Sequence, residues 1–293
     1  MVNNNDKLSG EFVMKRHIVC LTFDFDAQSA FIAKNLTTPT FLSRGEFGEV
    51  GAQRILALLK KYNILGTWFI PGVTIEAYPK ICDTIVAHDH EIAHHGWTHT
   101  PPAALSREKE LEDLMRANDT IRRLSGEAAV GYRSPSWDLS DHTVELLLNQ
   151  NFLYDSSMMG NDYTPYFARI GDVVHPDQAI RFGKPSQLLE MPISWSTDDY
   201  PHFEYVRTQE SVSPGLKAAS GVLENWINDY IYMQHNLDWG ILTYTFHPFC
   251  TGRGHRMIIL EELIKSLTEK NAVFMPLKAA AKEFKDLKPL KPN

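Results

Sequence analysis

The stretch HIVCLTFDFD, residues 17–26, decides the fold. It begins as an apolar run and ends in two aspartates, Asp24 and Asp26, which Phe25 separates. A short apolar run that closes on polar residues predicts a buried strand of a parallel sheet. Because alternate residues of a strand point to the same face, both carboxylates can enter one pocket, with Phe25 pointing away. The alternative is a pair of solvated aspartates in a loop.

Strand-like and helix-like segments alternate along the rest of the chain. The predicted strands cover residues 17–23, 66–72, 91–95, 129–134, 152–157, 188–194, 240–246 and 272–277. The predicted helices cover residues 50–62, 74–88, 106–126, 140–150, 220–236 and 256–270, with one more at the C-terminus. This alternation predicts an α/β fold in which a parallel sheet closes into one barrel-like domain. We expect a single domain over residues 1–293, with an N-terminal extension at 1–16 and a flexible tail at 285–293.

Composition excludes several classes of function. The net charge of −7 argues against nucleic acid and anionic membranes as partners. No run of eighteen apolar residues could span a membrane, and the polar N-terminus lacks the apolar core of a signal peptide. The three cysteines, Cys20, Cys82 and Cys250, are odd in number and far apart, which favours a reducing cytoplasm over a disulfide framework.

Two histidines follow the third predicted strand, in HHGWTH, residues 94–99. His95 and His99 have the i, i+4 spacing that presents both rings to one point on a helical turn. Two such histidines and one aspartate are a common catalytic zinc set that leaves positions open for water. The neighbouring His94 faces the other way, as a partner of a ligand or a packed side chain. A competing metal motif is HDH at residues 88–90.

Two further ionisable residues follow strands, so they are expected at the same edge of the barrel. Arg133 needs a carboxylate partner if it is buried, and Asp24 is the natural candidate. His247, in TFHPF, is either a general acid or a hydrogen-bonded core histidine. The aromatic candidates for substrate contacts, each of which could equally belong to the core, are Phe25, Trp97, Trp137 and Trp195.

Four motifs, TFDFD, HHGWTH, YRSPSW and TYTFHP, stand in the order typical of the polysaccharide deacetylase family. This family is also called the NodB-homology group or carbohydrate esterase family 4, and the chain resembles it from about residue 17 to 280. The resemblance implies a distorted (β/α) barrel and a divalent metal, usually zinc. Carried over by position, the metal ligands are Asp26, His95 and His99. Asp24 would then be the general base, Arg133 would orient it, and His247 would be the acid.

The chain departs from the family pattern at two places. Phe25 separates aspartates that are adjacent in secreted members, and Ala27 replaces a glycine. SWSTDDYPHF, residues 194–203, stands where another aspartate motif is expected, so Asp198 or Asp199 could support Arg133. These departures resemble a cytosolic branch that includes peptidoglycan-deacetylase-like proteins, allantoinase-type proteins without a cofactor, and bacterial cyclic imide hydrolases.

Within that branch the chain looks most similar to a cyclic imide hydrolase. The resemblance implies a homo-oligomer, typically a tetramer, and a small cyclic imide as substrate. Water activated by the metal would attack the carbonyl, and the ring would open to a half-amide. The irregular segment 160–187, with Tyr163, Tyr166 and Phe167, would cover the pocket. The alternatives are an N-deacetylase of amino sugars or peptidoglycan-like oligosaccharides, a metal-independent allantoinase-type ring opener, and a catalytically dead binding protein.

Overall fold

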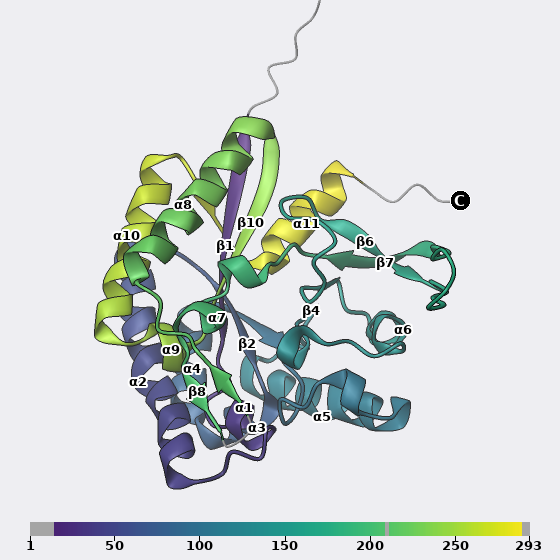
Figure 1. Cartoon of the computed structure of the whole chain (residues 1–293), viewed down its shortest axis with the longest axis horizontal. Coiled ribbons are helices and arrows are strands. Elements are labelled where there is room, and N and C mark those ends of the chain that lie inside the picture. Colours follow the sequence, from purple (N-terminus) through teal and green to yellow (C-terminus); the bar gives the residue numbers. More distant parts are fainter. Residues whose placement is uncertain (1–14, 209–210, 289–293) are drawn as a thin grey trace, which may run out of the picture.

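The computed structural model describes residues 15–208 and 211–288, which form a curled sheet wrapped by helices (Figure 1). The strands of the large sheet follow the order β10-β1-β2-β3-β4-β5-β7-β6, and β11 pairs with β1. Every pairing in this sheet is parallel except that of β6 with β7. The distorted (β/α) barrel expected from the sequence is therefore confirmed.

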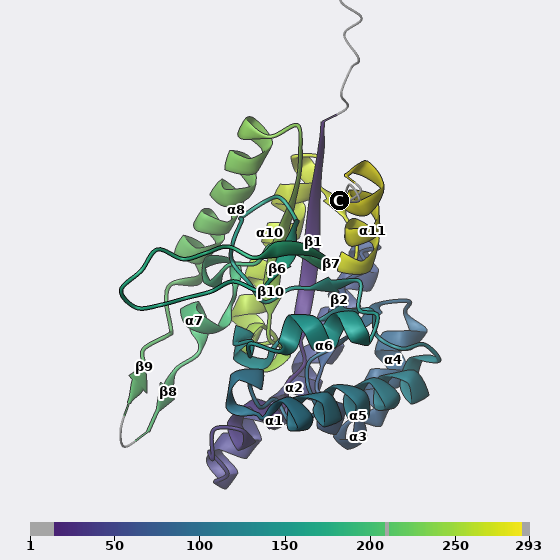
Figure 2. The same ribbon diagram turned by 90° about the vertical axis from the view of Figure 1, so that its right-hand side faces the viewer.

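The strands of this sheet are β1 (Arg16–Asp24), β2 (Thr67–Ile70), β3 (Glu91–His94), β4 (Gly131–Tyr132), β5 (Tyr154–Asp155), β6 (Tyr166–Ile170), β7 (Lys184–Glu190), β10 (Trp239–Phe246) and β11 (Val273–Phe274). A separate hairpin, which projects from the body in Figure 2, consists of β8 (Val206–Arg207) and β9 (Val212–Ser213).

The α-helices are α1 (Ser29–Ile32), α2 (Pro39–Tyr62), α3 (Gly72–Ala77), α4 (Pro79–Ala87), α5 (Arg107–Ser125), α6 (Thr143–Asn149), α7 (Tyr200–Phe203), α8 (Ala219–Asn236), α9 (Pro248–Thr251), α10 (Gly254–Glu269) and α11 (Leu277–Leu287). Short 3₁₀ turns occur at η1 (Pro102–Ala104), η2 (Pro135–Trp137) and η3 (Trp195–Thr197). The helix predicted over 74–88 is two helices, because Pro79 begins α4. Among the described residues, no helix is both long and apolar enough to cross a membrane.

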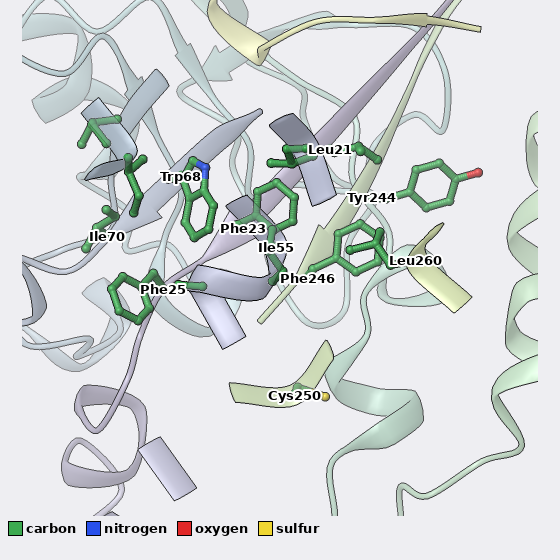
Figure 3. Packing of buried hydrophobic residues seen from close by; sticks show 14 of the residues in the cluster. Leu21, Phe23, Phe25, Ile55, Trp68, Ile70, Tyr244, Phe246, Cys250 and Leu260 are labelled. Atoms are coloured by element: carbon green, nitrogen blue, oxygen red, sulfur yellow. The ribbon is translucent and has the colours of Figure 1, made fainter. Parts of the chain in front are cut away.

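The two faces of β1 belong to different parts of the core. Phe23, together with Phe25 just beyond the strand, packs with Trp68 and with side chains of α2 and α10 on the outer face (Figure 3). Ile18 and Cys20, on the inner face, pack against the apolar side of α11. The next two inward-facing residues of β1 are Thr22 and Asp24, which are polar and lie at the carboxyl end of the strand. An apolar core thus ends, along one strand, in a polar pocket.

One boundary prediction needs correction, and one segment is more regular than expected. The tail was expected from residue 285, but α11 continues to Leu287. Residues 289–293 and residues 1–14 of the expected N-terminal extension lie outside the described part of the chain. The segment 160–187 forms β6, a Val173–Arg181 bridge and the start of β7 at the edge of the sheet. It therefore extends the sheet.

Candidate active site

The ionisable residues singled out in the sequence meet at the carboxyl edge of the parallel strands. Asp24 ends β1, His95 follows β3, Arg133 follows β4 and His247 follows β10. All four are buried. Several of these side chains line a cavity of about 160 Å³, which Lys34, Trp137, Trp195 and Tyr200 also line. A larger cavity of about 430 Å³, beside Glu91 and Lys278, lies at the opposite end of the strands and contains none of these residues.

Asp26, His95 and His99 form a compact group that could hold a metal ion. The Nε2 atom of His95 lies 3.3 Å from Asp26 Oδ1, and Nε2 of His99 lies 3.4 Å from Asp26 Oδ2. Burial raises the pKa of Asp26, but the charges and hydrogen bonds of His99 and His95 outweigh burial and hold that pKa well below its usual value. The carboxylate is therefore ionised, as a metal ligand must be.

The hydrogen bonds around this group fit a cation. Asp26 Oδ1 is buried and has no hydrogen-bond partner among the residues described. The Nδ1 atom of His95 donates to the carbonyl oxygen of Arg133 at 2.7 Å, so Nε2 is the ring nitrogen that faces Asp26 and is placed to bind a cation. Two imidazoles and one carboxylate suit zinc with open positions for other ligands. A bound divalent cation would lower the pKa of a water molecule and polarise a carbonyl group.

The proximity of the two histidines was predicted correctly, but for the wrong reason. Residues 95–100 form a loop, and not the helical turn that the i, i+4 spacing suggested. His99 reaches the site with a left-handed backbone, φ +62°. Ala27 (φ +49°), Ser136 (φ +56°) and Trp137 (φ +54°) also have this conformation close to the pocket. Non-glycine residues held in such conformations often cluster at functional sites.

Asp24 and Arg133 form a buried ion pair beside the metal-ligand group. Nη1 of Arg133 donates to Asp24 Oδ1 at 2.7 Å and to Thr22 Oγ1 at 2.9 Å. Its Nε and Nη2 atoms donate to the carbonyl oxygen and Oγ of Ser156. The second oxygen of Asp24, Oδ2, lies 3.8 Å from His95 Nε2. Arg133 therefore fixes the carboxylate with one oxygen facing the metal ligands.

The suggestion that Asp198 or Asp199 supports Arg133 is wrong. Both aspartates lie beside His247, because Asp198 forms a bridge with Thr245 of β10. Asp199 accepts hydrogen bonds from the backbone N–H of His247 at 2.9 Å and from its Nδ1 at 2.7 Å. Its Oδ2 also accepts from the hydroxyl of Thr251.

This arrangement prepares His247 to give up a proton. Burial lowers the pKa of His247, but the charges of Asp198 and Asp199 outweigh burial and hold the pKa well above its usual value. Because Asp199 holds Nδ1, the other nitrogen, Nε2, faces the pocket, 3.7 Å from Asp26 Oδ2. A protonated imidazole in this position can act as a general acid.

Lys34 and Tyr200 are pocket residues that the sequence analysis missed, and Asp198, which it considered only as a partner of Arg133, also lines the pocket. Asp198 is buried, and its Oδ1 accepts a hydrogen bond from the Tyr200 N–H at 2.6 Å. Burial, with a further contribution from the charge of Asp199, raises the pKa of Asp198, and the charge of His247 opposes this shift. Lys34 lies over the ring of Tyr200, 5.2 Å from its centroid, at the rim. The adjacent aspartates of SWSTDDYPHF were the available signal for Asp198.

Only two of the four proposed aromatic contacts line the pocket. Trp137 and Trp195 stack with ring centroids 4.0 Å apart. Phe25 is completely buried and packs in the core, so its assignment as a substrate contact is wrong. Trp97 is also outside the pocket, because its ring packs over Gly72 and beneath Arg116.

The remaining histidine candidates are structural. His94 lies outside the metal-ligand group and is buried beneath α5, where Nε2 contacts the carbonyl oxygen of Leu114. Burial lowers its pKa to about 3, so the ring is neutral. In the competing motif HDH, His88 bonds to the Thr84 carbonyl and His90 accepts from the Gly66 N–H. Tyr163, Tyr166 and Phe167 do not line the pocket either, so the expected cover over it is wrong.

Comparisons with known proteins agree with this geometry. The polysaccharide deacetylase family model matches residues 14–154. A peptidoglycan deacetylase of Helicobacter pylori is 32% identical over 272 residues, which cover 88% of this chain and 92% of that protein. A crystal structure from Mycobacterium smegmatis, assigned to the polysaccharide deacetylases, is 29% identical with a TM-score of 0.80 and covers 96% of both chains.

An allantoinase structure shares the fold, with 19% identity, a TM-score of 0.75, and coverage of 95% of this chain and 93% of that one. The family model and the H. pylori relative, together with this edge of aspartates and histidines, identify a hydrolase of carbon–nitrogen bonds. The chain belongs to the polysaccharide deacetylase family.

Proposed function

We propose that this protein opens small cyclic imides to half-amides, with a divalent cation, zinc in the first instance, held by Asp26, His95 and His99. The observation that carries this proposal is the small pocket beneath stacked indoles. Its volume of about 160 Å³ is well below the roughly 300 Å³ at which pockets for drug-sized ligands begin. Trp137 and Trp195 stack on each other, so the outer face of the stacked pair is what remains to pack against a planar ring.

The residues of the chain divide the reaction between them. Asp24, fixed by Arg133, accepts the proton of the water that attacks the imide carbonyl. The carbon–nitrogen bond breaks, and His247 donates a proton from Nε2 to the departing nitrogen. The products are a carboxylate and an amide on one molecule. Because an imide nitrogen is a better leaving group than an amine, the contribution of His247 is smaller for imides than for N-acetyl sugars.

We propose that the protein works in the cytoplasm as a homotetramer, without nucleic-acid or membrane partners. The three cysteines are buried and unpaired, which suits a reducing compartment. The segment between β6 and β7 exposes apolar side chains, with Val174 70% and Phe182 68% exposed, which suits burial against another copy. Light scattering on the purified protein tests the assembly, and a monomer at micromolar concentration contradicts it.

N-deacetylation of amino sugars is the second candidate. The H. pylori relative, a peptidoglycan deacetylase 32% identical to this chain, favours it. The first experiment incubates zinc-loaded protein with succinimide and glutarimide and follows the half-amide by chromatography. Turnover supports the imide proposal. Acetate release from N-acetylated oligosaccharides, without imide turnover, supports the second candidate. Imide activity that survives exhaustive chelation points instead to a metal-independent ring opener.

A further inference from the structure

Two buried carboxyl groups face each other beside the active-site loop, at positions the reaction does not use. Asp155 ends β5 and Glu190 ends β7, and the two residues are register partners in the sheet. Neither side chain is exposed to solvent. One oxygen of each, Asp155 Oδ2 and Glu190 Oε2, is buried without a hydrogen-bond partner among the described residues. Two ionised carboxylates buried on neighbouring, register-paired residues repel each other, and a proton shared between them removes this repulsion.

The other oxygens of the pair hold the chain that follows β5. Glu190 Oε1 accepts from the backbone N–H groups of Ser157 and Met158 at 2.8 and 2.7 Å. Asp155 Oδ1 accepts from the hydroxyl of Ser157 at 2.6 Å. The Ser157 hydroxyl oxygen in turn accepts from the N–H of Ser134 at 2.9 Å. Three of these hydrogen bonds connect the pair, through Ser157, to Ser134, the residue directly after Arg133.

Ser134 controls the turn that presents the pocket residues. Its hydroxyl lies within hydrogen-bond distance of the carbonyl oxygens of Pro135 and Asp138, and so closes the turn that carries Ser136 and Trp137 in left-handed conformations. Residues in this conformation need support from the surrounding structure. Arg133, at the start of the same turn, donates to Ser156, the residue after Asp155.

We propose that Asp155 and Glu190 share one proton, and that this carboxyl–carboxylate pair positions Arg133 and Trp137 for catalysis. Asp155 and Glu190 are positioning residues, because they act through Ser157 and Ser134 and do not line the pocket. The inference concerns the geometry of the site, so it holds whichever carbon–nitrogen bond the enzyme breaks.

The electrostatic environment supports a shared proton. Burial raises the pKa of Asp155 to about 6. Burial, and after it the charge of Asp155, raises the pKa of Glu190 well above its usual value. Burial and the charge of Asp155 thus favour the protonated form of Glu190, whose carboxyl group can donate a hydrogen bond to Asp155. The other titratable or charged groups that face the pair are Arg133, Tyr132 and Tyr166.

The test uses the stacked indoles as a reporter that needs no substrate. Rings stacked 4.0 Å apart give an exciton-coupled circular dichroism signal, which the Trp137→Phe variant assigns to Trp137 and Trp195. In the wild type we expect this signal to fade as the pH rises and Glu190 loses its proton. Glu190→Gln keeps a hydrogen-bond donor at all pH values, so its signal should persist. Glu262→Gln, at an exposed position on α10, is the matched control and should titrate like the wild type.

Kinetics give the second readout. Glu190→Gln should retain neutral-pH activity, whereas Glu190→Ala should lose about 10²-fold in kcat/KM, the usual effect of a misplaced catalytic group. The inference is overturned if the wild type and Glu190→Gln show the same pH dependence of the signal. It is also overturned if Glu190→Ala folds with normal signal and activity. A wild type that opens no imide but shows the expected titration refutes the proposed substrate and leaves the carboxyl pair standing.

Discussion

The active site contains two groups of similar composition, Asp26 with His95 and His99, and His247 with Asp198 and Asp199. In the first group a buried oxygen of Asp26 lacks a hydrogen-bond partner in the described structure, and Nδ1 of His95 bonds to the Arg133 carbonyl oxygen, so that Nε2 faces Asp26. In the second, both oxygens of Asp199 accept hydrogen bonds, two of them from His247 itself.

This difference separates a metal site from a proton-transfer site. Unused lone pairs that converge on one point attract a cation. A carboxylate whose lone pairs are already occupied by N–H and O–H donors instead fixes a histidine tautomer and raises its pKa. Residue type alone does not distinguish the two groups, and Asp198 Oδ2 in the second also lacks a hydrogen-bond partner in the described structure. The hydrogen bonds from His247 to Asp199 make the difference, because they commit this histidine to a carboxylate.

The largest expected effect comes from removing a ligand of the first group. Asp26→Asn or His99→Ala should abolish tight binding of zinc and lower kcat/KM by about 10³-fold or more, because the carbonyl is no longer polarised. Metal content after dialysis and steady-state kinetics measure both effects. Asp199→Asn is the matched control from the second group, and it should bind zinc like the wild type. Near-full metal content in the Asp26 and His99 variants would refute the ligand assignment.

Replacing the histidine of the second group should cost less. His247→Ala removes the general acid, a loss that usually lowers rates by about 10²-fold to 10⁴-fold. We expect the lower end of that range for imides, and unchanged metal content, because His247 supplies no ligand to the first group. Steady-state kinetics of the His247→Ala and Asp26→Asn variants, both measured with succinimide, provide the comparison. A loss for His247→Ala that equals or exceeds the loss for Asp26→Asn would contradict the division of roles.

Neutralising Asp199 should change the pH profile and leave the metal in place. Burial lowers the pKa of His247 and the two aspartates raise it, so Asp199→Asn should let that pKa fall. A general acid is active while protonated. The alkaline limb of kcat should therefore move to lower pH. A pH–rate profile with metal content determined in parallel measures this shift, and a limb that stays in place would assign the raised pKa to Asp198 alone.

The fold and the metal ligands could be predicted because they depend on short-range patterns. The alternation in HIVCLTFDFD places apolar residues on both faces of β1 and carries Asp24 inward at its end. Parallel strands then bring the residues after β3, β4 and β10 to the same edge. None of these steps requires knowledge of loop conformation.

The errors concern long-range pairing and loop conformation. The bridge between Asp198 and Thr245 carries residues 198–199 to β10 and away from Arg133, and no local pattern encodes that bridge. Trp97 and Trp137 both follow strands, yet only Trp137 reaches the pocket, after a turn with two left-handed residues. Phe25 was assigned to substrate, although strand alternation directs it into the core.

The smallest effect should come from Thr251, which donates to Asp199 from α9. Thr251→Val removes one donor while Asp199 keeps its bonds to His247, so more of the carboxylate charge acts on the imidazole. The alkaline limb should then move to higher pH, opposite to the effect of Asp199→Asn. A single hydrogen bond contributes about 1 kcal/mol and one pKa unit corresponds to about 1.4 kcal/mol, so the shift should stay below about one pH unit. Thr251→Ser restores the donor and should restore the wild-type profile. If the alkaline limb of Thr251→Val moves to lower pH instead, the Thr251 hydroxyl, and not the charge of Asp199, keeps the pKa of His247 high.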